Sequence, residues 1–190
     1  MKKLLSALSF FCAVALQAQD MKALQTDALR MYKNTTAGKY EALLADTYPK
    51  IFELVPKEKM LEVLKSTLKG NGYVLDILDT PPNFKFNDIK TVNGGYYTVI
   101  DHDLLIKMTF TEPLKGIEAK EMIKNLKASM KTDDVTFNPS FNSFTIKKRG
   151  DILAISNSVT GGKWKFLNRT SPAMMKKVLG EEVCKALNIQ

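Results

Sequence analysis

The sequence predicts an α+β fold: a curved antiparallel sheet packed against N-terminal helices, with one inserted helix and a C-terminal helical tail. Three observations predict it. Apolar residues recur at helical spacing from residue 20 to residue 68. Residues 73–111 then show strand-like alternation, broken by the hairpin dipeptide Asn93-Gly94. Helical spacing returns from Ile117 to Lys131, before more strands follow. Helices segregated from a run of strands are typical of the α+β class.

Residues 1–18 have the pattern of a signal peptide. Lys2 and Lys3 precede an apolar core, Leu4 to Leu16, which is shorter than the roughly 20 residues that cross a bilayer. Ala18 is a small residue suited to cleavage. We therefore expect an exported bacterial protein, periplasmic or secreted, without a stable membrane anchor. Residues 19–190 are expected to form a single cone-like domain.

Charge and cysteine content narrow the classes of partner. The formal net charge is +8, carried mostly by lysines scattered along the chain, so a nucleic-acid partner is not expected. Only Cys184 remains after cleavage, which predicts a buried thiol on the C-terminal helix. The chain has no Cys/His cluster and no phosphate-binding glycine loop, so neither a metal nor a cofactor is expected.

The N-terminal part predicts successive helices. These cover residues 20–32 and 39–47, separated by a loop at 34–38. Pro49 kinks the chain, and Pro56 opens the next helix, which ends at Gly70. The predicted buried stripe of this last helix is Met60, Leu61, Leu64 and Leu68.

The long strand predicted at residues 94–111 organises the domain, after shorter strands at 73–78 and 84–92. Its alternate residues from Tyr96 to Phe110 form an apolar face that only Thr98 and His102 interrupt. The polar run 101–103 predicts a bend or a β-bulge.

Three further strands are predicted at residues 135–147, 152–159 and 163–168. Arg149-Gly150 and Gly161-Gly162 are interpreted as the turns between them. This interpretation puts an adhesion-like tripeptide, residues 149–151, at a hairpin tip, although turn chemistry alone explains its glycine and aspartate. Ser171 with Pro172 caps a final helix that Gly180 interrupts.

The run from Thr47 to Glu58, together with Trp164-Lys165-Phe166, resembles small exported bacterial proteins of unknown function. The element order is similar to the cystatin-like cone of the nuclear transport factor and ketosteroid isomerase superfamily. This resemblance implies a pocket between helices and sheet. The superfamily includes isomerases, dehydratases, ligand carriers and interaction modules. No catalytic motif of the superfamily matches residue by residue, and the inserted helix departs from its plan.

Four residues are candidates for ligand binding: His102, Trp164, Tyr48 and Tyr40. The single histidine has two interpretations, a pocket acid/base that titrates near neutrality or a hydrogen-bonded polar residue at a bend. Trp164 is expected under the helices, where it can also line a cavity; Tyr40 and Tyr48 are most simply core. Asp101 and Asp103 share the opposite strand face, but two carboxylates without a third ligand are a weak cation signal.

Two functions follow from these features. The first is a non-catalytic binding or interaction module for a small apolar ligand or an envelope protein. The alternative is an isomerase- or dehydratase-type enzyme that uses His102. A carboxylate beside His102 in an enclosed cavity favours the enzyme, and a closed core around it favours the module. A homodimer formed through the sheet is a further hypothesis.

Overall fold

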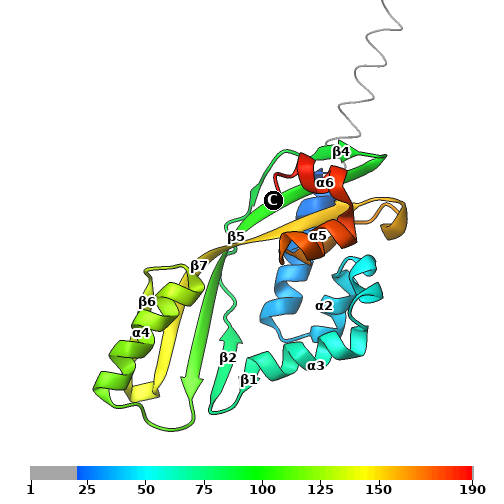
Figure 1. Cartoon of the computed structure of the whole chain (residues 1–190). Coiled ribbons are helices and arrows are strands. Elements are labelled where there is room, and N and C mark those ends of the chain that lie inside the picture. The colour runs from blue at the N-terminus through cyan, green and yellow to red at the C-terminus, as the bar shows by residue number, and fades with distance from the viewer. Residues whose placement is uncertain (1–20, 190) are drawn as a thin grey trace, which may run out of the picture.

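A computed structural model describes residues 21–189 and confirms the α+β fold (Figure 1). The predicted signal peptide and its cleavage point lie outside the described residues. Residues 21–36 are helical. The other α-helices are α2 (Tyr40–Asp46), α3 (Lys57–Leu68), α4 (Gly116–Met130), α5 (Pro172–Leu179) and α6 (Glu181–Ala186). Short 3-10 turns occur at η1 (Pro49–Glu53), η2 (Pro139–Phe141) and η3 (Ser158–Thr160).

One antiparallel sheet runs through the molecule. Its strands are β1 (Lys69–Gly70), β2 (Tyr73–Ile77), β3 (Lys85–Phe86), β4 (Lys90–Val92), β5 (Gly95–Phe110), β6 (Val135–Asn138), β7 (Ser143–Ser156) and β8 (Lys165–Asn168). The main order is β1-β2-β5-β7-β6, while β3 and β4 also pair with β5, and β8 pairs with β7. Figure 1 shows β5 and β7 as a long twisted ribbon that joins two halves of the sheet.

Each half of the sheet has its own core. In the half that holds β8, the helix of residues 21–36 covers one face, over Ile100, Trp164 and Phe166. Helices α5 and α6 cover the other face, over Leu153 and Ile155. In the half that holds β6, α4 packs over the sheet, and its cluster comprises Met108, Ala119, Leu126, Val135, Phe144 and Ile146. Cys184 is fully buried on α6, which confirms that prediction.

The long strand is confirmed as β5, but the predicted bulge is not present. The register with β7 is unbroken from Tyr96 opposite Ser156 to Thr109 opposite Ser143. His102 lies opposite Gly150 within this ladder. The strand pair therefore curves by its own twist, without an inserted residue.

The turn predicted at Arg149-Gly150 was wrong. Strand β7 continues through both residues, and the chain turns instead at η2, where Asn142 has a left-handed φ of 46°. Gly150 serves close packing, because a Cβ there would lie 3.1 Å from Leu104 Cδ1. The adhesion-like tripeptide is thus inside a strand, where Arg149 forms an ion pair with Asp103 and Asp151 forms one with Arg169.

Two other boundaries differ from expectation. The strand predicted at 84–92 is split into β3 and β4, and in the gap between them the buried Thr98 hydroxyl donates to Asn87 O at 2.8 Å. The first helix extends through residues 34–36, predicted as a loop, and Thr35 Oγ1 donates back to Met31 O at 2.9 Å within it. Gly38, with φ 65°, follows the helix.

Candidate functional site

A groove of about 380 Å³ opens between α2, α3 and the outer edge of β2. Leu64 and Leu68 of α3 form one apolar wall, and Tyr40 and Leu43 of α2 form another. The rest is lined by residues 35–38, before α2, and by residues 75–79 along β2. Its volume lies within the range of small-molecule sites, about 300–1,000 Å³.

Helix α3 is only partly buried, which contradicts the sequence prediction. Its apolar stripe of Met60, Leu61, Leu64 and Leu68 was expected to be buried, yet no residue of this helix is buried. All four side chains are half-buried, while Val63, on another side of α3, is 51% exposed. The groove lies between α3 and β2 where a fully packed helix would lie against the strand. Helix α3 therefore has the predicted apolar stripe, but residues 21–189 bury that stripe only in part.

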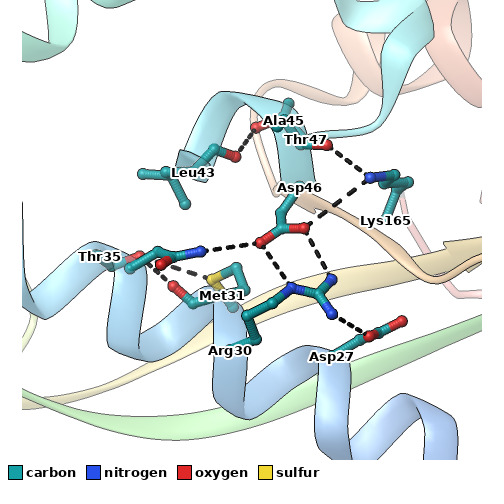
Figure 2. Close-up of polar contacts among 10 residues, drawn as sticks. Asp27, Arg30, Met31, Thr35, Leu43, Ala45, Asp46, Thr47 and Lys165 are labelled. Atoms are coloured by element: carbon teal, nitrogen blue, oxygen red, sulfur yellow. Dashed lines mark hydrogen bonds and ion pairs between the residues drawn. The ribbon is translucent and has the colours of Figure 1, made fainter. Parts of the chain in front are cut away.

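A cluster around the buried Asp46 fixes the wall formed by α2 (Figure 2). Arg30 donates to Asp46 through Nη2 at 2.8 Å and through Nε at 3.4 Å. Asn34 Nδ2 donates to the same carboxylate at 3.2 Å, and Lys165 Nζ lies 3.9 Å from it. The hydrogen bond to Asp46 raises the pKa of Arg30 above its usual value. The carboxylate is thus fully engaged in holding α2 against the first helix and β8.

Two ion pairs involve residues that line the groove or are adjacent in sequence to residues that do. Glu41 of α2 and Lys65 of α3 are 3.4 Å apart and connect the two helices. The pKa of the Glu41 carboxyl is lowered below its usual value by a hydrogen bond from the backbone N–H of Glu41 and by the contact with Lys65. At the end of the groove beyond β2, Lys33 Nζ donates to both oxygens of Asp79 at 2.8 Å. Both ion pairs are solvent-exposed, so each contributes little to the stability of the fold.

His102 lies away from this groove, in an aromatic enclosure. Its side chain is 8% exposed, and its ring contacts Tyr32 and Phe84 with centroids 5.9 Å and 6.1 Å away. Its Nδ1 is buried without a hydrogen-bond partner, and among residues 21–189 no carboxylate bonds to the ring. Burial lowers the pKa of His102 below its usual value, so the imidazole is neutral at pH 7. His102 lines neither this groove nor the one beside the centre of the β5–β7 ribbon.

The four predicted site residues are not brought together. Trp164 is 3% exposed in the core beside Phe166. Tyr48 is 2% exposed, and its hydroxyl accepts a hydrogen bond from Asn157 Nδ2 at 3.1 Å. Only Tyr40 lines the groove. Groove residues that the sequence analysis assigned to the core or left unassigned include Leu43, Leu64, Leu68, Leu75 and Ile77.

A second groove, of about 500 Å³, lies beside the centre of the β5–β7 ribbon. Leu104 and Leu105 are among its lining residues, but its charged side chains are largely paired with one another. Asp103 accepts from Asn83 at 2.7 Å and from Arg149 at 2.6 Å, and these bonds lower the pKa of its carboxyl. The Asp103 carboxylate therefore already accepts hydrogen bonds within the fold, and its role is structural. Within the described part of the chain, no group of three His, Cys, Asp or Glu side chains is placed to hold a metal ion.

No family model matches the chain, and searches of curated proteins and of solved structures found no match. None of the helices in residues 21–189 is long and apolar enough to span a bilayer. Function must therefore be inferred from the groove and from the surroundings of His102.

Proposed function

We propose that this protein is an exported, non-catalytic binding module that holds an apolar group in the groove between α2, α3 and β2. The observation that carries the proposal is the incomplete burial of α3. An amphipathic helix in a globular domain normally buries its apolar stripe against the core. Here Leu64 and Leu68 face a groove instead.

A bound apolar group would complete that burial. Leu64, Leu68, Leu75 and Ile77 are all half-buried, so each has apolar surface left to cover. Full burial of one such side chain contributes about 1.5–3 kcal/mol, and a ligand in the groove would gain a part of this from each wall. The groove thus supplies a driving force for binding that the free protein does not use.

The surroundings of His102 support the non-catalytic module over the enzyme. A general base must reach its substrate proton, directly or through one water. The imidazole is instead covered by Tyr32 and Phe84, and no carboxylate orients it. These features are those of a closed core, which favours the module over the isomerase- or dehydratase-type enzyme.

The test uses a neutral apolar dye, N-phenylnaphthylamine, whose fluorescence rises in apolar sites. We expect saturable binding to the wild-type protein. Leu68→Glu places a carboxylate in the apolar wall and should weaken binding by about tenfold or more. Val63→Glu makes the same change on another side of α3 and should leave affinity within about twofold.

Thermal unfolding of both variants shows whether the fold is retained. Leu64→Gln alters the same wall more gently and serves if Leu68→Glu is destabilised. Dye binding that is unaffected by both groove variants, or equally affected by Val63→Glu, would contradict the proposal.

A further inference from the structure

The outer edge of β2 lies inside the groove. Thr111 N donates to Gly72 O at 3.0 Å, and Leu78 N donates to Leu105 O at 2.8 Å. The register between them pairs Asp76 with Lys107 and Ile77 with Ile106. Antiparallel ladders alternate between hydrogen-bonded and non-hydrogen-bonded pairs. The backbone N–H and C=O of Ile77 therefore point away from β5, toward the groove.

No strand of residues 21–189 lies opposite Ile77 on that edge. Strand β1 reaches only Tyr73 and Val74. Outside the β2–β5 ladder, no hydrogen bond in the described chain involves the backbone of Ile77. An unpaired strand edge is a template for another chain, and addition of a strand to a sheet edge is a recurring mode of peptide recognition.

The groove has the length of a short strand. Residues 75–79 line it, which corresponds to about 13 Å at 3.3 Å per residue. Leu68 and β1 close one end, and the Lys33–Asp79 ion pair stands at the other. An extended segment of roughly four residues therefore fits alongside β2.

Side-chain chemistry on the two faces of β2 defines the segment. A residue opposite Ile77 would point to the same face as Ile77, toward the apolar walls of the groove. Asp76 lies on the other face and has no ion-pair partner within residues 21–189. Its cross-strand neighbour Lys107 is placed over the Phe141 ring, 5.8 Å from its centroid. A lysine or arginine opposite Asp76 would supply the missing charge.

We propose that the groove binds an extended peptide segment as a strand antiparallel to β2, with an apolar residue opposite Ile77 and a basic residue next, opposite Asp76. The inference rests on the proposed function, which it deepens by naming the occupant. In this arrangement the apolar residue exchanges both main-chain hydrogen bonds with Ile77. The N–H of the basic residue points away from β2.

The test measures fluorescence anisotropy with a labelled peptide, Ser-Thr-Val-Lys-Ser, and two N-methylated forms. Methylation of the valine nitrogen removes the donor to Ile77 O and should weaken binding by about tenfold. Methylation of the lysine nitrogen is the matched control and should change affinity by less than about threefold. Equal affinity of the two methylated peptides would overturn strand addition.

A charge exchange tests the position of the basic residue. Replacing the peptide lysine by glutamate should weaken binding to the wild-type protein, and Asp76→Lys should reverse this preference. If Asp76→Lys leaves the preference unchanged, the proposed register is wrong.

The naphthylamine dye separates this inference from the proposed function. Peptide that displaces the dye supports both. Dye that binds and is not displaced overturns the peptide while the groove remains a binding site, and absence of both kinds of binding contradicts both.

Discussion

The buried imidazole of His102 should make folding stability depend on pH in a predictable direction. Burial is the main cause that lowers its pKa, and Arg149 acts in the same sense. The Asp103 backbone and the charges of Asp103 and Asp151 oppose it without reversing it. The folded state therefore takes up this proton at a lower pH than the unfolded chain, whose histidine titrates near pH 6.5. This histidine therefore leaves the free energy of unfolding unchanged well above about pH 6.5 and lowers it as the solution is acidified below that pH.

The size of the effect follows from linkage. At pH 7.5 the unfolded histidine is mostly neutral, and the contribution is close to zero. At pH 5.5 protonation of the unfolded chain removes up to about 1.4 kcal/mol of the free energy of unfolding. The chain has one histidine, so no other imidazole contributes.

The measurement is urea unfolding of the wild-type protein and of His102→Gln at both pH values, followed by Trp164 fluorescence. Glutamine does not titrate, so subtracting the two profiles cancels the contribution of the carboxylates. We expect the wild type to lose more stability than the variant between pH 7.5 and pH 5.5. Parallel profiles would refute the reasoning, and a wild type that gains stability on acidification would indicate a paired, charged histidine.

Three further predictions concern other parts of the molecule. Burial raises the pKa of the Cys184 thiol, so labelling of the native protein by a thiol reagent should be slow and should accelerate on unfolding; fast stoichiometric labelling would contradict this. Asp46→Asn should lower the free energy of unfolding by about 1–3 kcal/mol, because Arg30 and Lys165 lose a charged acceptor, whereas an unchanged urea midpoint would mean that the cluster is dispensable. Intact-mass analysis of protein recovered from the cell envelope should show cleavage near Ala18, and a mass that retains residues 1–16 would show that the segment is not removed.

Local signals predicted much of the fold. Asn93-Gly94 forms the expected turn, with φ values of 49° and 73°, before β5. Ser171 accepts from Met174 N at the start of α5, as its position before Pro172 predicts. These features depend on a few adjacent residues, so a single sequence is enough to find them.

The errors arose where distant residues decide the structure. Gly150 has the appearance of a turn residue, but its role depends on His102 and Leu104 in the neighbouring strand. The stripe on α3 correctly predicted a helix, yet periodicity does not reveal how completely the rest of the chain covers it. Tyr40 lines the groove, whereas Tyr48 and Trp164 lie in the core, and the sequence does not separate them because all three occupy apolar positions that look alike.

Methyl NMR is the most direct test of the groove as the binding site. The naphthylamine dye would be titrated into protein with labelled isoleucine and leucine methyl groups. We predict that the methyl signals of Leu64, Leu68 and Ile77 shift together and saturate, while those of Leu153 and Ile155, buried in the core under α5 and α6, stay in place. Shifts confined to residues around His102, or no saturable shift at the groove, would contradict the account.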